Sequence, residues 1–372
     1  MKKLLFIFGT RPEAIKLAPL IRFCETARDP FEVRVCATAQ HREMLDDVLE
    51  FFAVEPHYDL NLMRPNQTLF DITIAGLQGL KGVLETFRAD SIVVQGDTTT
   101  AFVGALAGFY TKTSVSHIEA GLRSGNKFSP YPEEMNRVLA GHLADFHFAP
   151  TDLAAKNLSR ESITENVWVV GNTVIDALFL GLNIIDATQA NRFQDYFDYV
   201  DFSKKIILMT CHRRESFGKP LEDIFGAVRE LSCRYADLEF IYPVHLNPNV
   251  QDPASRILGG CSNIHLIEPL SYAQLIWIMS KSHFILTDSG GIQEEAPSLG
   301  KPVLVLRDVT ERQEGIDAGT ARLVGTDREV ILREASRLLE DPDCYQAMAR
   351  AVNPYGDGNA SGRIADIWRE VL

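Results

Sequence analysis

Short apolar runs alternate with helix-like segments from one end of the chain to the other. Within each run the apolar positions are nearly continuous, which is typical of strands buried on both faces of a parallel sheet. Because helical segments separate the strands, we predict two Rossmann-like α/β domains. The first series of predicted strands is Leu4–Phe8, Val33–Thr38, Ile92–Gln95, Val115–Ile118, Phe146–Ala149 and Val167–Val170, and the second is Ile206–Thr210, Glu239–Val244, Ile264–Ile267, Phe284–Thr287, Val303–Leu306 and Arg322–Val324.

A polar stretch lies between the two series of strands. The segment DATQANRFQDYFDYVDFSKK, residues 186–205, is the best linker candidate. We predict an N-terminal domain of residues 1–170 and a C-terminal domain of residues 171–359, and we expect the last helix, residues 360–372, to return to the first domain. Ligands of such sheets bind at the carboxyl ends of the strands, so two facing sheets predict a site in the cleft between them.

The net charge limits the partners that we expect, and the cysteines indicate the redox state of the thiols. A formal net charge of -13 disfavours nucleic acid and anionic membrane surfaces as main partners. The six cysteines are scattered and form no CxxC pair, which fits reduced thiols better than a disulfide framework or a zinc site. No apolar stretch approaches the ~20 residues of a membrane span, and the first apolar run is too short for a signal peptide. We therefore expect a cytoplasmic protein.

Polar clusters follow most of the predicted strands. They read GTRPEAIK, TAQHRE, QGDTTT and HIEAGLRS in the first half, and TCHRRESFG, PVHLNP and TDSGGIQEEAPSLG in the second. Taken singly, each has a structural explanation. Asp97 and Asp288 suit helix N-caps. Arg11 and Lys16 suit solvated first turns, and His245 suits a buried core position. Because all the clusters fall at one end of the sheets, a ligand site is the better interpretation of the set.

The SGG sequence at residues 289–291 opens a predicted helix. Backbone N–H groups without a Cβ in the way, together with the helix dipole, suit a phosphate, and Glu295 could reach ribose hydroxyls beyond it. No GxGxxG follows a strand, since GDGNASG at Gly356 comes after the last one, and GxxxxGK[ST] is absent. His and Cys residues show no zinc-type spacing. We therefore expect no cofactor and no metal.

Taken together, these stretches resemble the non-hydrolysing UDP-N-acetylglucosamine 2-epimerases. The match comprises FGTRPEAIK, TAQHREML, GDTTT, HIEAGLRS, SPYPEEMNR, GNTVIDAL, HRRESFG, YPVHLNP, TDSGGIQEEAPSLGKPVLVLRD and NPYGDGNAS, almost end to end and in order. The resemblance implies a glycosyltransferase-B type architecture, a homodimer, and the substrate UDP-N-acetylglucosamine with UDP in the cleft. Gln313 stands where the family usually has proline, which puts the geometry of that loop in doubt.

The resemblance also implies roles for individual residues. Asp97, Glu119 and Glu133 are expected to be catalytic, and which of them removes the C2 proton stays open. Arg11, Lys16 and His212 are expected to stabilise the departing diphosphate, and His212 is also a candidate proton donor. Further substrate-binding candidates are Arg213, Ser289, Gly290, Gly291, Glu295 and Arg312, and a second, regulatory substrate site is expected near the first, with Gln40, Glu43 and His245 as candidates.

The expected reaction is the reversible epimerisation of UDP-N-acetylglucosamine to UDP-N-acetylmannosamine by elimination and re-addition of UDP, feeding a bacterial surface polysaccharide. A glycosyltransferase of the same architecture is one alternative, since fold alone does not fix function. A hydrolysing epimerase, a non-catalytic nucleotide-sugar sensor and an enzyme for UDP-diacetamido-uronic acids are the others. Three carboxylates around the sugar are more than a transferase requires, which favours the epimerase.

Overall fold

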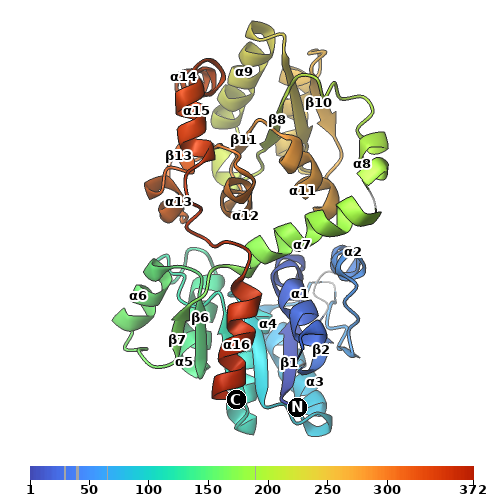
Figure 1. Ribbon diagram of the computed structural model, residues 1–372, viewed down its shortest axis with the longest axis vertical. Coiled ribbons are helices and arrows are strands. Elements are labelled where there is room, and N and C mark those ends of the chain that lie inside the picture. The colour runs from blue at the N-terminus through green and yellow to red at the C-terminus, as the bar shows by residue number, and fades with distance from the viewer. Residues whose placement is uncertain (29–30, 39–41, 65, 189) are drawn as a thin grey trace. The chain divides into compact units, whose positions relative to one another are not determined.

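The computed structural model describes residues 1–28, 31–38, 42–64, 66–188 and 190–372 (Figure 1). The chain divides into two compact units. Unit 1 comprises Met1–Leu180 and Tyr355–Leu372, and unit 2 comprises Gly181–Pro354. The domain limits expected from the sequence, after residue 170 and before residue 360, stay a prediction.

Unit 1 is built on a seven-stranded sheet in the order β3-β2-β1-β4-β5-β6-β7, with every pair of neighbours parallel. The strand order reverses between β1 and β4, which makes the loops after these two strands the switch point where such sheets bind ligands. The strands are β1 (Lys3–Phe8), β2 (Glu32–Ala37), β3 (Tyr58–Asp59), β4 (Ser91–Gln95), β5 (Ser114–Ile118), β6 (Phe146–Ala149) and β7 (Val167–Val169).

The helices of unit 1 bury the apolar strands, and the last of them comes from the far end of the chain. Trp368 of this helix is fully buried, and its indole N–H donates to Ser116 Oγ at 2.9 Å. Its ring meets Phe6 and Phe148 edge-on, so the C-terminal helix belongs to the core of unit 1. The helices are α1 (Arg11–Thr26), α2 (Arg42–Phe52), α3 (Leu69–Thr86), α4 (Thr99–Thr111), α5 (Glu133–Leu143), α6 (Asp152–Arg160) and α16 (Ala360–Val371), and α7 (Thr173–Thr188) begins here.

Unit 2 repeats the winding with a six-stranded parallel sheet in the order β10-β9-β8-β11-β12-β13. Its switch point lies between β8 and β11. The strands are β8 (Lys205–Thr210), β9 (Leu238–Pro243), β10 (Ile264–Ile267), β11 (Phe284–Thr287), β12 (Val303–Val305) and β13 (Ala321–Leu323). The helices are α8 (Ala190–Tyr196), α9 (Lys219–Arg234), α10 (Pro248–Leu258), α11 (Tyr272–Lys281), α12 (Gly290–Glu295), α13 (Gln313–Asp317), α14 (Arg328–Glu340) and α15 (Pro342–Ala349), with short 3₁₀ helices at Arg214–Ser216 and Ala296–Leu299.

The sequence correctly predicted twelve of these strands to within one residue at either end. It missed β3, whose two residues offer no apolar run. The linker candidate at residues 186–205 was wrong, because α7 ends in it and α8 lies within it. Its aromatic residues anchor it to unit 2, since the Phe197 ring stacks on Trp277 with centroids 5.3 Å apart. No helix among the described residues is long and apolar enough to cross a membrane.

Candidate functional site

The switch point of unit 1 is tied together by Glu13, which lies in the first turn of α1. Its Oε2 accepts hydrogen bonds from the backbone N–H groups of Gly9 and Thr10 at 3.0 and 2.8 Å, and its Oε1 accepts one from the Thr98 hydroxyl at 2.6 Å. Burial raises the pKa of the Glu13 carboxyl, although these hydrogen bonds oppose the shift. Glu13 therefore joins the loop after β1 to the loop after β4.

Glu119 follows β5, and its carboxylate is held by several partners. Its backbone has a positive φ of 63°, a conformation that costs a non-glycine residue about 1–3 kcal/mol and persists where neighbouring contacts enforce it. Those contacts are strong. Oε1 accepts from Lys16 Nζ at 2.5 Å and from Asn172 Nδ2 at 2.8 Å, and Oε2 accepts from Gln95 Nε2 at 2.5 Å. The carboxylate is thus buried, paired with a cation and fixed in direction.

Asp97 lies in the loop between β4 and α4, and its carboxylate pairs with Arg137 of α5. The helix-cap explanation for Asp97 was wrong, because the N-cap of α4 is Thr98, whose side chain accepts from Ala101 N. The Asp97 side chain is 30% exposed. It therefore remains accessible to a ligand while Arg137 holds its orientation.

Glu133 and Glu134 open α5, and the structure gives them different roles. The Glu134 carboxylate is buried and accepts from Ser124 N and Gly125 N at about 3 Å, and it pairs with Arg137. It therefore shapes the loop that precedes the helix. Glu133 is half-buried, and its carboxylate makes no hydrogen bond or ion pair within the described ranges of the chain. Of the two, Glu133 has oxygen atoms available for a substrate.

Arg11 and Lys16 both lie on α1. Arg11 is the first residue of the helix and is partly exposed. Lys16 is not the solvated charge that its position suggested, because its side chain is only 16% exposed and is paired with Glu119. The positive charge of Lys16 is therefore directed first at a predicted catalytic carboxylate.

In unit 2 the SGG sequence lies at its predicted place, at the start of a helix. Ser289 is the N-cap of α12, and its side chain makes no capping hydrogen bond. Gly290 and Gly291 form the first positions of the helix. A Cβ on Gly290 would lie 3.1 Å from Glu311 Oε1, and a Cβ on Gly291 would lie 3.7 Å from Glu295 Oε2. Glu295 is buried and accepts from the Tyr272 hydroxyl at 2.9 Å, so its carboxylate is held in place.

His212 follows β8 and lies beside Asp288, which follows the neighbouring strand β11. The two residues flank the switch point, and His212 Nδ1 is 3.2 Å from Asp288 Oδ1. Asp288 is not the N-cap of α12, so that explanation was wrong; its Oδ2 accepts from the backbone N–H groups of His212 and Arg213. The His245 ring stacks on His212 with centroids 5.4 Å apart and an angle of 11°.

Two arginines predicted to bind the substrate are engaged with acidic residues of unit 2. Arg312 pairs with the buried carboxylate of Glu294. Arg213 Nη2 is 3.9 Å from Glu311 Oε1, and its side chain is 39% exposed. Arg213 is therefore more open to an incoming anion than Arg312, whose side chain is 16% exposed.

The residues expected to form a regulatory site are described only in part. Gln40 lies outside the described residues, and so does the side chain of Glu43. His245 is exposed, which rules out the buried core position that its neighbouring apolar residues had suggested. Its Nδ1 accepts from Asn247 N at 3.1 Å.

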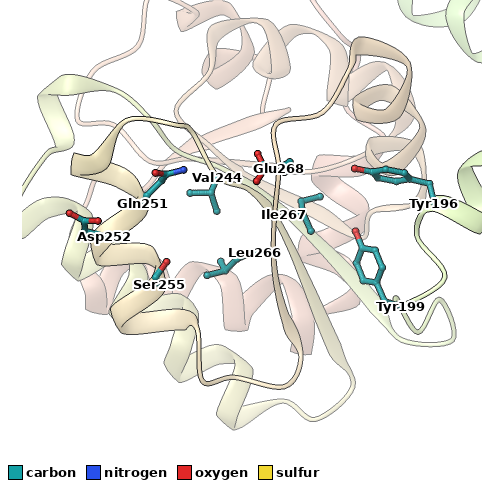
Figure 2. A pocket seen from close by; sticks show the side chains of 9 residues that line it. All are labelled: Tyr196, Tyr199, Val244, Gln251, Asp252, Ser255, Leu266, Ile267 and Glu268. Atoms are coloured by element: carbon teal, nitrogen blue, oxygen red, sulfur yellow. The ribbon is translucent and has the colours of Figure 1, made fainter.

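A cavity of about 710 Å³ lies elsewhere in unit 2. Figure 2 shows Tyr196 and Tyr199 on one side of it, Gln251, Asp252 and Ser255 of α10 on the other, and Leu266 and Ile267 of β10 between them. Its lining, as far as the chain is described, contains none of the residues predicted for the site. This cavity is therefore not formed by the residues predicted for the site.

The site also contains residues that the sequence interpretation passed over. Gln95 and Asn172 hold Glu119, Arg137 holds Asp97, and Glu13 joins two loops. Gln95 gave a usable signal, because a polar residue at the end of a buried strand needs a partner. The described residues include no group of three or more His, Cys, Asp or Glu side chains that could hold a metal ion.

Comparison with known proteins gives consistent matches over the whole chain. A family model described as UDP-N-acetylglucosamine 2-epimerase matches residues 25–369. The UDP-N-acetylglucosamine 2-epimerase of Escherichia coli K12 is 52% identical over 368 residues, which cover 98% of this chain and 97% of that protein.

Solved structures agree with this match. The crystal structure of UDP-GlcNAc 2-epimerase from Neisseria meningitidis bound to UDP-GlcNAc superimposes with a TM-score of 0.90 at 49% identity, covering 99% of this chain and 100% of that one. Sucrose-phosphate synthase from Thermosynechococcus elongatus has a TM-score of 0.65 at 11% identity, covering 100% of this chain and 99% of that one, which is a likeness of fold alone. These likenesses confirm the expected fold class, two parallel-sheet α/β domains of the glycosyltransferase-B type. The chain belongs to the UDP-N-acetylglucosamine 2-epimerase family.

Proposed function

We propose that this protein catalyses the reversible epimerisation at C2 of UDP-N-acetylglucosamine to UDP-N-acetylmannosamine. The observation that carries the proposal is the set of carboxylates in unit 1. Asp97 and Glu119 follow neighbouring strands of the sheet, and Glu133 opens α5. Asp97 is paired with Arg137 and Glu119 with Lys16, whereas the Glu133 carboxylate has no partner among the described residues. Proton transfer on two faces of one carbon needs more than one such group.

The reaction proceeds by elimination and re-addition. A base removes the C2 proton while the C1–O bond to UDP breaks, the C2–H electron pair becomes the second bond between C1 and C2, and UDP departs with the C1–O pair. The intermediate is 2-acetamidoglucal. A proton then reaches C2 from the opposite face, and a phosphate oxygen of UDP re-forms the bond to C1. The net reaction consumes no water, and this distinguishes it from hydrolysis of the UDP-sugar.

The three carboxylates differ in ways that suit different steps. Glu133 makes no internal hydrogen bond within the described residues, so its lone pairs can accept a proton from substrate. Asp97 is paired with Arg137, and Glu119 receives three donors. One of these two held carboxylates serves the opposite face of C2 in proton transfer, and the other stabilises positive charge as it develops at C1.

Unit 2 supplies groups suited to UDP. We propose that Ser289, Gly290 and Gly291 receive the diphosphate and that Glu295, held by Tyr272, meets the ribose. The relative from Neisseria meningitidis was crystallised with UDP-GlcNAc, which supports this class of ligand. Arg213 and His212 are further candidates for contact with the diphosphate. Arg312 is another candidate in unit 2, and its guanidinium is paired with Glu294. On α1 of unit 1, Arg11 and Lys16 are the remaining diphosphate candidates.

A second copy of the chain is the expected partner. On helices α3 and α4, which pack against each other, Phe70 is 81% exposed and Phe109 is 62% exposed. Ile74 and Tyr110 on the same two helices are also exposed, and exposed apolar side chains of this kind suit a homodimer interface. Sedimentation should give twice the chain mass, and Phe109→Asp should shift the protein toward a monomer; a monomeric wild type would refute the dimer.

The remaining proposals follow from the family assignment. The enzyme works in the cytoplasm, needs no added cofactor or metal, supplies surface polysaccharide synthesis, and is activated by its own substrate at a second site that includes Gln40, Glu43 and His245. A hyperbolic rate curve with one UDP-N-acetylglucosamine bound per subunit would refute the second site. Activity lost on dialysis and restored by one cofactor would refute cofactor independence.

One assay separates the epimerase from its alternatives. The protein is incubated with UDP-N-acetylglucosamine alone, and the sugar and nucleotide are followed by proton NMR. We expect an equilibrium mixture of the two UDP-sugars, with only traces of UDP. Steady release of N-acetylmannosamine would indicate a hydrolase, and an unchanged substrate would indicate a transferase or a sensor.

A further inference from the structure

His212 and Asp288 form a pair at the switch point of unit 2. Thr210 and Thr287 are partners in the register of β8 and β11, so the residues just beyond them emerge side by side. The Asp288 side chain is fully buried, whereas the His212 side chain is 43% exposed. The buried carboxylate therefore lies beneath the imidazole, on the side away from solvent.

Asp288 has one oxygen atom committed to the backbone and one that needs the imidazole. Oδ2 accepts from His212 N at 2.6 Å and from Arg213 N at 2.7 Å. Oδ1 is buried without a hydrogen-bond donor aligned on it in the described ranges, and His212 Nδ1 lies 3.2 Å away. Leaving a buried carboxylate oxygen unsatisfied is costly, so Nδ1 is where the ring carries a proton.

The electrostatics of the pair agree with this arrangement. Burial would raise the pKa of Asp288, but the side chain of His212 and the two backbone N–H groups outweigh it and lower the pKa. Asp288 is thus an ionised acceptor that can balance an imidazolium. The neighbouring Cys211 thiol stays neutral, because burial, the charge of Asp288 and a hydrogen bond with Asp288 raise its pKa well above the ordinary value.

The other groups around His212 restrict its ring without competing for Nδ1. His245 stacks flat on it at 5.4 Å, and the Arg213 side chain points to Glu311. With Nδ1 turned toward Asp288, the second ring nitrogen, Nε2, is the atom presented by the exposed part of the side chain. Orientation of one imidazole nitrogen by a buried carboxylate is how acid–base histidines are commonly set.

We propose that Asp288 is a positioning residue that holds the His212 imidazolium with Nε2–H directed at the diphosphate oxygen on which negative charge develops as the C1–O bond breaks. The proton stays on Nε2 and strengthens its hydrogen bond as UDP leaves, so His212 stabilises the leaving group without changing the proton balance of the reaction. This inference rests on the proposed epimerase function.

The test is Asp288→Asn, whose shape is nearly unchanged. The amide oxygen must accept the two backbone N–H groups, so the NH₂ group faces Nδ1 and opposes the imidazolium. We expect kcat to fall by roughly 10²-fold with KM changed much less. The pH above which activity is lost should fall by about one unit or more.

A double-mutant cycle with His212→Asn separates positioning from a structural role. If Asp288 acts through His212, Asp288→Asn should cost little in the His212→Asn background. An equal loss in both backgrounds, with no shift of the pH profile, would overturn the proposal. Asp252→Asn, an exposed aspartate of the same unit, is the matched control and should match wild type.

A spectroscopic measurement keeps the proposal testable without turnover. Nitrogen-15 NMR of the ligand-free protein, with His212→Asn used to assign the signals, reports which ring nitrogen is protonated in neutral His212. We expect protonation at Nδ1. Protonation at Nε2 in wild type would overturn the proposal even if the enzyme epimerises, and protonation at Nδ1 in a protein that does not epimerise would refute only the function.

Discussion

The two units share one winding, and the loops at their switch points hold different chemistry. In unit 1, acidic side chains beyond the carboxyl ends of the strands are fixed by a hydroxyl or a cation: Glu13 by Thr98, Asp97 by Arg137, and Glu119 by Lys16. In unit 2, where β8 meets β11, one buried carboxylate serves an exposed histidine, and a helix begins with two glycines. We propose that the same winding thus presents proton-transfer groups in one unit and phosphate-binding groups in the other.

This contrast shows how function is added to a repeated fold. The parallel sheet determines where loops emerge, and it leaves the side chains of those loops to the sequence. Unit 1 contains buried polar networks, and such networks are stable only when every donor and acceptor is satisfied. Its carboxylates should therefore be sensitive both to loss of charge and to loss of their partners.

The largest effect is expected from the three predicted catalytic carboxylates of unit 1. Asp97→Asn, Glu119→Gln and Glu133→Gln should each lower kcat by roughly 10²-fold or more, because acid–base groups contribute on that scale. Affinity for UDP, measured by calorimetry, should change less than about threefold if UDP is bound mainly by unit 2. Glu165→Gln, an exposed control in the same unit, should be unaffected; equal losses of UDP affinity and kcat would break the comparison.

The next effect tests the ion pair of Glu119. Lys16→Met should lower the free energy of unfolding by about 3 kcal/mol, because it leaves a buried carboxylate without its cation. The double variant Lys16→Met, Glu119→Gln should recover much of that loss, since the uncompensated charge is gone. Denaturant titration of Lys16→Met, Glu119→Gln and the double variant measures this directly, and additive losses would show that the pair is not coupled.

Glu13 gives a pH-dependent prediction. Its folded-state pKa lies above the ordinary value of 4.5, so the folded protein binds this proton more tightly than the unfolded chain. Stability from this group is therefore present at low pH and falls as pH rises from about that ordinary value through the raised folded value.

Glu13→Gln should remove this dependence, with its amide oxygen accepting the two backbone N–H groups and its NH₂ donating to Thr98. Glu13→Ala should cost about 2 kcal/mol more, because those N–H groups lose their acceptor. Thermal melts across the pH range compare the two variants. A wild-type stability that rises through the same range would contradict the assignment.

The smallest effect is expected on the free energy of unfolding, and it distinguishes the helix-cap role of Thr98 from the role of Asp97. Thr98→Ala should lower the free energy of unfolding by about 1 kcal/mol, the usual value of a helix N-cap. Asp97→Asn should cost less than half of that while losing far more activity. A reversed order of stabilities would restore the helix-cap role of Asp97.

Strand positions were predictable because strands buried on both faces are apolar along most of their length, as at Val303–Val305. The predicted position of the candidate site rests on a related pattern, since polar residues just beyond such strands emerge at one edge of the sheet. The hydrogen-bond and ion-pair partners of these residues could not be predicted from the sequence. Lys16 and Glu119 are 103 residues apart, and their pairing depends on strand order and on the positive φ of Glu119. The segment at residues 186–205 misled because its polar residues hide Phe193 and Phe197, which are buried.

The most direct test of the central claim is the fate of the C2 hydrogen. The protein is incubated with UDP-N-acetylglucosamine in D₂O, and the nucleotide-sugars are analysed at equilibrium by mass spectrometry and NMR. If unit 1 removes and returns a proton at C2, UDP-N-acetylmannosamine should carry deuterium at that position. Epimer that retains protium at C2 would contradict the elimination and re-addition mechanism, and the absence of epimer would contradict the function itself.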